Sequence, residues 1–334
     1  MTAPRFVEDL NQALHQVLAG GDDTYLLGQD IADPYGGAFK ATRGLSSRFP
    51  QRVLSTPISE AAMVGAAGGL ALAGNKVIVE VMFSDFVTLA FDPIVNYLSK
   101  ATTMYGSTQS VRVVVRCPTG GGRGYGPTHS QSLQKHFMGV PGLAVYEATP
   151  FHRNLSVLLG MLGEGRPCLY FEDKTLYGER VYEHGVVSPT FGYELVDGHD
   201  GLARVRCVDT PAPDVVVIAT GGMARRAVRA AERAMLEHEV VAEVVVPVRL
   251  YPVPTEALLA CIGATGRVVV AEESTAGASW SAAVAEQIHA ARWGRLRRPV
   301  RSVTSADSVI PAAPHLERAT LAQESDILAA ILEP

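Results

Sequence analysis

Short apolar runs, often β-branched, alternate along most of the chain with segments whose apolar residues recur at helical spacing. Apolar runs without polar alternation are typical of parallel strands covered on both faces, so the first half is predicted to be α/β. Its predicted strands are Tyr25–Gln29, Lys76–Met82, Val111–Arg116, Leu143–Tyr146 and Pro167–Glu172. Its predicted helices are an amphipathic start within residues 1–16, then Glu60–Ala73, Phe86–Met104, Ser130–Met138 and Phe151–Leu162.

The pattern restarts after a more polar region, residues 181–211, which has no clear period and is interpreted as a connection. The strands predicted beyond it are Asp214–Thr220, Val240–Leu250, Arg267–Ala271 and Val300–Thr304. The helices predicted there are Met223–Glu237, Pro254–Cys261, Ser279–Trp293 and Leu321–Leu332. With 334 residues, the chain exceeds the roughly 250–300 at which single cores stop growing. We therefore predict two open, mainly parallel-sheet domains, 1–185 and 210–334, joined by a linker at 186–209.

Composition and charge indicate which kinds of binding partner to expect. A net charge of −5 argues against a nucleic-acid surface, and the apolar run Ala61–Ala73 is too short to span a bilayer. We therefore expect neither a nucleic-acid nor a membrane partner. Four cysteines without metal or redox spacing favour a cytoplasmic protein. The hydrophobic share of 47% favours burial of extra surface against another subunit.

A carboxylate stands at the start of a helix rich in small residues. Pro57 restricts the residue before it to extended geometry, and Ser59 is a good N-cap, so the helix is predicted to begin at Glu60. A carboxylate in a first turn can simply complement the helix dipole. A chemical role for Glu60 is favoured by other residues of the same half.

Those residues follow two predicted strands. Phe83 and Phe86 come after one of them, where a ligand ring could stack, although such residues are also common in cores. The glycine-rich segment 119–127 follows the next strand and lacks both the lysine of a P-loop and the dinucleotide spacing. It is therefore interpreted as an active-site loop. His129 comes directly after it and is a candidate acid or base, the alternative being a structural histidine.

Several segments together carry a resemblance to a known family. They are Thr56-Pro57-Ile58-Ser59-Glu60, Phe91-Asp92 with Asn96, His129-Ser130-Gln131-Ser132, Pro141-Gly142-Leu143 and Thr220-Gly221-Gly222-Met223. They resemble the beta subunit of the decarboxylating component of 2-oxo acid dehydrogenase complexes, which are thiamine-diphosphate enzymes of the transketolase superfamily. The resemblance runs over nearly the whole chain. It implies a pyrimidine-binding domain followed by a transketolase-type C-terminal domain.

The resemblance also implies roles for particular residues. Glu60 matches the glutamate that hydrogen-bonds the aminopyrimidine ring of the cofactor and so lets that ring move protons. Phe86 matches the aromatic residue that packs on the pyrimidine, and Ile58 and Met82 are predicted to contact the cofactor beside it. His129 matches the active-site histidine, an acid towards the acyl acceptor. Glu60 and His129 are thus the predicted catalytic residues.

The diphosphate half of the site is missing from this sequence. The superfamily binds the diphosphate through Mg²⁺ held by a Gly-Asp-Gly motif and a later asparagine, and the chain has no Gly-Asp-Gly. The resemblance implies that an alpha subunit supplies both, in an alpha-two beta-two heterotetramer. Some members hold potassium near the positions of Met161, Leu162, Glu164 and Arg166. Because position 166 is an arginine, no metal ligand is predicted on this chain.

Departures from the family pattern leave the acceptor open. They are Gly139, Pro93, Thr102 and Thr103. The first hypothesis is decarboxylation of a 2-oxo acid, such as pyruvate, with transfer of the acyl unit to the lipoyl group of an acyltransferase. The second is a carboligase that transfers a two-carbon unit to a ketone or sugar. The third is a non-catalytic assembly subunit, against which the presence of Glu60 and His129 counts. The identity of the 2-oxo acid stays open.

Overall fold

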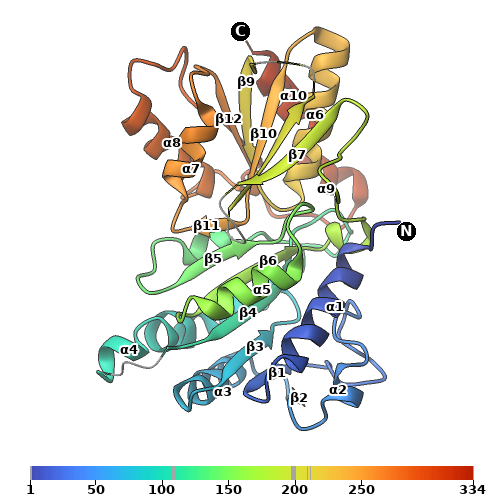
Figure 1. The fold of residues 1–334 in the computed structure, drawn as a ribbon, viewed down its shortest axis with the longest axis vertical. Helices are drawn as coiled ribbons and strands as arrows, with labels where there is room; N and C mark the ends of the chain where they lie inside the picture. The colour runs from blue at the N-terminus through green and yellow to red at the C-terminus, as the bar shows by residue number, and fades with distance from the viewer. Residues whose placement is uncertain (1, 107–109, 197–200, 209, 211, 334) are drawn as a thin grey trace.

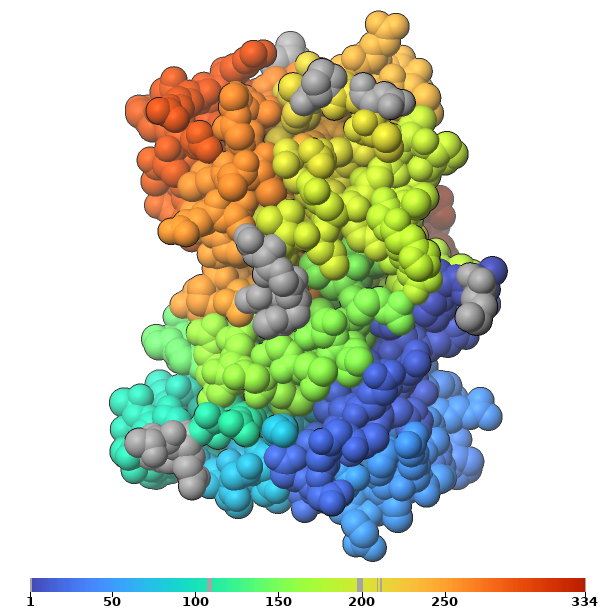
Figure 2. Space-filling view, viewed as in Figure 1, coloured from blue at the N-terminus to red at the C-terminus, as the bar shows by residue number. Residues whose placement is uncertain are grey.

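Two sheets, each with its own helices, are stacked along the long axis of the molecule (Figure 1). The computed structural model describes residues 2–106, 110–196, 201–208, 210 and 212–333. In the space-filling view the second half of the chain, yellow to red, sits directly on the first half, blue to green (Figure 2). None of the helices within the described residues is both long enough and apolar enough to cross a membrane.

The first sheet follows the order β11-β5-β6-β4-β3-β1-β2, and its strands are parallel except for β11. Its strands from the first half are β1 (Thr24–Gly28), β2 (Val53–Ser55), β3 (Lys76–Glu80), β4 (Val113–Thr119), β5 (Ala144–Glu147) and β6 (Cys168–Asp173). The helices of this half are α1 (Phe6–Ala19), α2 (Leu45–Arg48), α3 (Glu60–Leu72), α4 (Ala101–Met104) and α5 (Asn154–Gly163).

Alternate residues of these strands serve two separate cores. Leu26, Ile78 and Val114 pack with α1 and α5 on one face of the sheet. Leu27 and Val79 pack with α3 on the other face. Both faces are covered by helices, which is why the strands read as continuous apolar runs.

The second sheet follows the order β13-β12-β9-β10-β8-β7. Its strands are β7 (Phe191–Val196), β8 (Leu202–Cys207), β9 (Val215–Ala219), β10 (Ala242–Pro247), β12 (Val268–Thr275) and β13 (Arg301–Ser305). Its helices are α6 (Met223–His238), α7 (Thr255–Ile262), α8 (Trp280–Arg292), α9 (Pro314–Thr320) and α10 (Glu324–Leu332). β13, β12, β9 and β10 run parallel, whereas β8 and β7 are antiparallel. The predicted pair of mainly parallel α/β sheets is confirmed.

The segment 186–209, interpreted as a linker, contains strands β7 and β8, which pair with each other and with β10. Residues 197–200 and 209 of this segment lie outside the described residues. These antiparallel strands have one polar, half-exposed face, so they lack the continuous apolar run that marks a buried parallel strand.

Two helix predictions in the first half were wrong. The segment 86–104 is broken into a 3₁₀ helix (Ser84–Ala90), a π-helix (Pro93–Leu98) and α4, because Pro93 has no N–H for a continuous helix. In the segment 130–138 only a 3₁₀ turn, Gln134–Phe137, forms. There the Asp85 carboxylate accepts the backbone N–H of Gln131 at 3.3 Å, which draws that residue out of a helical turn.

The predicted strand 240–250 is divided between the two sheets. Its first part forms β10, and β11 (Arg249–Tyr251) leaves the second sheet to pair antiparallel with β5. In Figure 1 β11 lies at the boundary between the two halves. α2, β2 and α9 were not predicted from the sequence, and the last helix begins at Glu324 instead of the predicted Leu321.

Candidate active site

The predicted site residues lie at the carboxyl edge of the first sheet. Gly28 of β1 pairs with Glu80 of β3, which pairs with Arg116 of β4, so these strands end side by side. Gln29 directly follows β1, Met82 is the second residue after β3, and the glycine-rich loop begins at the end of β4. Ligands of open α/β sheets bind beyond this edge.

Glu60 begins α3 and is 4% exposed. Gln29 Nε2 donates a hydrogen bond to Glu60 Oε1 at 3.0 Å, and the Thr56 N–H donates to the Gly28 carbonyl oxygen at 2.9 Å. Ser59 occupies the predicted N-cap position with extended backbone, although its side chain makes no cap hydrogen bond. The carboxyl is thus buried and tied to the end of β1.

His129 lies edge-on against two phenylalanine rings. Its ring centroid is 4.8 Å from that of Phe83 and 5.1 Å from that of Phe86, both in T-shaped geometry. Tyr125 packs on Phe83 at 5.9 Å, and the Thr128 hydroxyl lies 3.0 Å from His129 Nδ1. Phe86 and His129, expected in one site, are therefore neighbours. They form an aromatic cluster with Phe83 and Tyr125.

Two further predicted residues lie on the same edge. Met82 is half-buried beside Phe83. Ile58 is 78% exposed, two residues before Glu60, and is accessible to a bound molecule. Gln29 was not predicted as a site residue; its signal was that it is the polar residue at the end of an apolar strand. Asp85 was not predicted either, and its Oδ1 accepts a hydrogen bond from Gln131 Nε2 at 2.8 Å.

These side chains fit the pyrimidine end of thiamine diphosphate. A buried carboxyl can bind a ring nitrogen, and aromatic side chains can pack on a flat heterocycle. The glycine-rich loop does not offer a phosphate cradle, because Glu273 accepts the N–H of Gly121 and Glu317 accepts those of Gly122 and Gly124. Within the part of the chain that the structure describes, no group of three or more His, Cys, Asp or Glu side chains could hold a metal ion.

Arginines bind the carboxylate of Glu164. Arg166 Nε lies 2.6 Å from Glu164 Oε2, and Arg249 NH2 lies 2.7 Å from Glu164 Oε1. Arg249 comes from β11, so this carboxylate also connects the two halves of the chain. The positive charge next to the Glu164 carboxylate therefore comes from these two arginine side chains.

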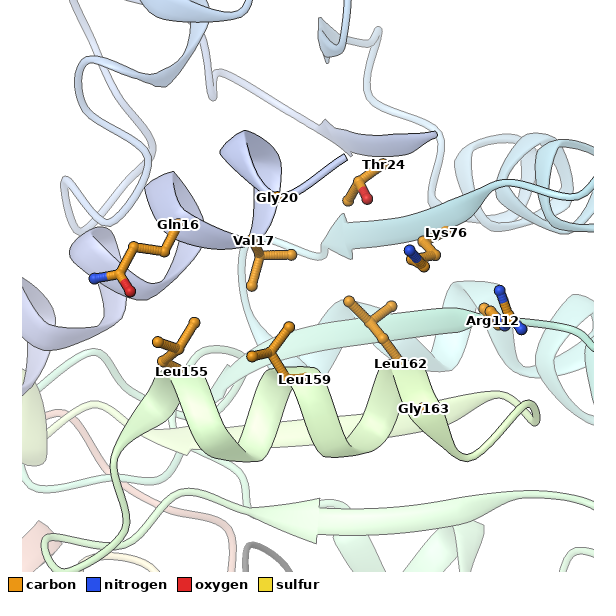
Figure 3. Close-up of a pocket in the computed structure, with 10 residues that line it drawn as sticks. All are labelled: Gln16, Val17, Gly20, Thr24, Lys76, Arg112, Leu155, Leu159, Leu162 and Gly163. Carbon is orange, nitrogen blue, oxygen red and sulfur yellow. The ribbon is translucent and has the colours of Figure 1, made fainter. Parts of the chain in front are cut away.

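Two cavities differ in their relation to these residues. One, of about 510 Å³, lies between α1 and α5 and includes Thr24 and Lys76, where β1 and β3 begin (Figure 3). It is at the opposite edge from the predicted residues and is not the candidate site. The other, of about 530 Å³, is lined by Gln131 and Ser132, just after His129, and by Glu273 of the second half.

Comparisons with known proteins agree with this geometry. Residues 4–178 match the family model "Transketolase, pyrimidine binding domain", and residues 205–327 match "Transketolase, C-terminal domain". A solved "Split gene transketolase, inactive beta4 tetramer" has the same fold, with a TM-score of 0.70 and 21% identity, covering 98% of this chain and 97% of that one.

Named relatives are similar over nearly their full length. The beta subunit of the acetoin:2,6-dichlorophenolindophenol oxidoreductase of Cupriavidus necator is 30% identical, covering 96% of this chain and 94% of that protein. The mitochondrial pyruvate dehydrogenase E1 component subunit beta of Saccharomyces cerevisiae is 30% identical, covering 98% and 87%. The chain therefore belongs to the transketolase family, among the beta subunits of the thiamine-diphosphate-dependent 2-oxo acid dehydrogenases.

Proposed function

We propose that this subunit takes part in decarboxylating a 2-oxo acid such as pyruvate and passing the acyl unit to a lipoyl group. The observation that carries the proposal is one edge of the sheet that bears a buried carboxyl, Glu60, and the adjoining rings of Phe86 and His129. When bound, thiamine diphosphate supplies the carbanion stabilisation that decarboxylation requires.

The chain's own residues then bind, orient and move protons. Glu60 would bind the pyrimidine nitrogen and exchange a proton with it, and Gln29 orients its carboxyl through the 3.0 Å hydrogen bond. Phe86, with Met82 and Ile58, would pack on the flat ring and exclude water from it. His129, half-buried and beside Thr128, gives a proton to the acyl acceptor.

An alpha subunit completes the site in this proposal. It holds the diphosphate and Mg²⁺, in an alpha-two beta-two heterotetramer that delivers acyl units to a lipoyl acyltransferase. Two observations support this division of the site: the sequence lacks Gly-Asp-Gly, and the amides of its glycine-rich loop are bound by carboxylates. The words "subunit beta" in the relatives' names also support a partner chain.

The test is Glu60→Gln in the subunit reconstituted with its alpha partner. The amide preserves an acceptor for Gln29 but cannot exchange a proton, so carbon dioxide release from pyruvate should fall by about 10²–10⁴-fold while the assembled mass is unchanged. Glu256→Gln is the matched control, because Glu256 is an exposed glutamate in the first turn of α7. Near-normal release by Glu60→Gln would remove Glu60 from the proposed role. Lipoamide and a ketone, supplied separately as acceptors, distinguish the dehydrogenase from a carboligase.

A further inference from the structure

Residues 119–131 form a closed loop that carries His129. The Gly120 N–H donates to the Gln131 carbonyl oxygen at 3.3 Å, and the Thr119 hydroxyl donates to the same oxygen at 3.1 Å. The loop residues with positive φ are Gly120 (+85°), Gly122 (+81°), Gly124 (+71°) and Gly126 (+77°). Alternation of left-handed glycines with other conformations turns successive N–H groups towards a common point, where a negative charge can bind.

Two carboxylates of the second half bind these N–H groups. Glu317 of α9 is 4% exposed. Its Oε1 accepts the Gly122 N–H at 2.9 Å, and its Oε2 accepts the Gly124 N–H at 3.0 Å. Glu273 of β12 accepts the Gly121 N–H at 2.8 Å. Hydrogen bonds to charged acceptors are about twice as strong as neutral ones, so the second half holds the tip of the loop.

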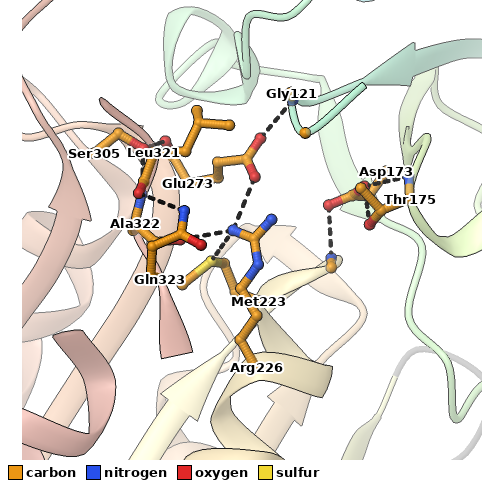
Figure 4. Close-up of polar contacts among 12 residues, drawn as sticks. Gly121, Asp173, Thr175, Met223, Arg226, Glu273, Ser305, Leu321, Ala322 and Gln323 are labelled. Atoms are coloured by element: carbon orange, nitrogen blue, oxygen red, sulfur yellow. Dashed lines mark hydrogen bonds and ion pairs between the residues drawn. The ribbon is translucent and has the colours of Figure 1, made fainter. Parts of the chain in front are cut away.

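Glu273 also binds the residue that directly follows the loop, and its own position is fixed. Its Oε1 accepts the Ser132 hydroxyl at 3.2 Å. Arg226 of α6 donates to Glu273 Oε2 at 3.0 Å and to the Ala322 carbonyl oxygen at 2.8 Å (Figure 4). The carboxylate is therefore anchored between α6 and the segment that leads into α10.

The loop also packs closely against the apolar side chain of Leu321 in the second half. A Cβ atom added at Gly121 would lie 2.6 Å from Leu321 Cδ1, so any larger residue there would require the Leu321 side chain to shift. At the other end of the loop, Asp85 of the first half binds Gln131. The segment between these supports contains Tyr125 and His129, two members of the aromatic cluster.

We propose that Glu317 and Glu273 are positioning residues for His129. They hold the loop in the conformation that places the His129 ring against Phe83 and Phe86. The second half of the chain thus contributes to acyl transfer without touching the substrate. This inference rests on the proposed role of His129 in the reaction.

The first part of the test measures the loop directly, on the full-length chain. In Glu317→Ala, amide hydrogen exchange over residues 119–131 should become about tenfold faster or more, because charge-assisted hydrogen bonds to its N–H groups are lost. Glu317→Gln retains an oxygen acceptor and should fall between wild type and the alanine variant. It also carries the test if the alanine variant does not fold. Glu324→Ala is the matched control, because Glu324 of α10 binds only Arg229 and Arg233 among the described contacts and lies outside the loop. Unchanged exchange in both Glu317 variants would overturn the proposal.

The second part measures acyl transfer in the complex with the alpha partner. Glu317→Ala should slow transfer more than carbon dioxide release, as is also expected of His129→Ala, and the double variant should be no slower than His129→Ala alone. Losses that multiply in the double variant would overturn the proposal, because Glu317 would then act independently of His129. If His129→Ala transferred the acyl unit at the wild-type rate, the proposed role of His129 would be wrong, and the inference that rests on it would fall with it. The hydrogen-exchange data would still show separately whether Glu317 holds the loop.

Discussion

Lys174 is a buried cation at the end of β6, beside the aromatic cluster. Its Nζ finds no hydrogen-bond acceptor among the described residues and lies 5.6 Å from the Phe83 ring centroid. Burial lowers the pKa of Lys174 from 10.5 to about 8, although Asp173 and Asp85 favour its charge. Because the folded-state pKa is below the unfolded one, the cost of burying the charge is fully present below pH 8. It is relieved as the pH rises towards 10.5.

We therefore expect Lys174→Met to raise the free energy of unfolding by about 1–3 kcal/mol at pH 7. The difference from wild type should shrink between pH 8 and pH 10.5, as wild-type lysine releases its proton in the folded state. Urea unfolding at a series of pH values measures this, with the exposed Lys100→Met as the control. A difference that does not change with pH would contradict the assigned titration.

At the scale of elements, one ion-pair network connects three strands of the first sheet. Arg116 of β4 is fully buried and donates to Glu80 of β3 at 2.7 Å. It also donates to both carboxylate oxygens of Glu172 in β6, at 2.7 and 2.9 Å. The Tyr177 hydroxyl donates to Glu172 at 2.7 Å. The network lies just below the carboxyl edge that bears the candidate site.

Arg116→Met should lower the free energy of unfolding by about 3–5 kcal/mol, because two buried carboxylates lose their counter-charge. The matched control is Arg206→Met, which removes another cross-strand pair, with Glu194 at 2.8 Å, where both side chains are about half exposed. That change should cost at most about 1 kcal/mol. If the two substitutions lowered the free energy of unfolding equally in denaturant titrations, the contribution of the Arg116 network to stability would not come from its burial.

At the scale of the whole molecule, two carboxyl groups of the first half accept hydrogen bonds from the turn that leads into α6. Glu147 accepts hydrogen bonds from Gln134 Nε2 at 2.9 Å and from the Thr220 hydroxyl at 3.1 Å. Asp173 Oδ2 accepts the Gly222 N–H at 3.0 Å. Burial, and next the charge of Asp173, raise the pKa of Glu147 well above its ordinary value. The folded interface therefore favours a protonated Glu147.

Glu147→Gln should be well tolerated, because the uncharged amide can still accept from Gln134 Nε2 with its oxygen, and its NH2 group can donate to the Thr220 hydroxyl oxygen in place of the bond now accepted there. A carboxyl whose folded-state pKa is raised loses stability as the pH rises above its unfolded value of about 4.5. Thermal unfolding of the glutamine variant should therefore match wild type within about 1 kcal/mol near pH 4.5 and gain on it towards pH 8. A variant less stable than wild type at every pH would mean that the interface needs the charge.

Local patterns in the chain were enough to predict two α/β halves and a carboxylate at the start of α3. Strand burial on both faces, helical periodicity and the Pro57–Ser59 turn are properties of neighbouring residues, so they can be read without a structure. The resemblance to a known family added Phe86 and His129 as members of one site. The helix predicted over 130–138 failed because Asp85, far away in the sequence, binds Gln131 instead.

Long-range contacts were decided only by the folded molecule. Glu273 is 152 residues from Gly121, and Glu317 is 195 residues from Gly122, yet both bind the loop that carries His129. β11 similarly leaves one sheet to complete the other. No local period marks such contacts, because each joins two segments that are far apart in the sequence and adjacent only in the folded molecule. The same is true of Lys174, because nothing in the neighbouring sequence indicates that this lysine is buried in the folded molecule.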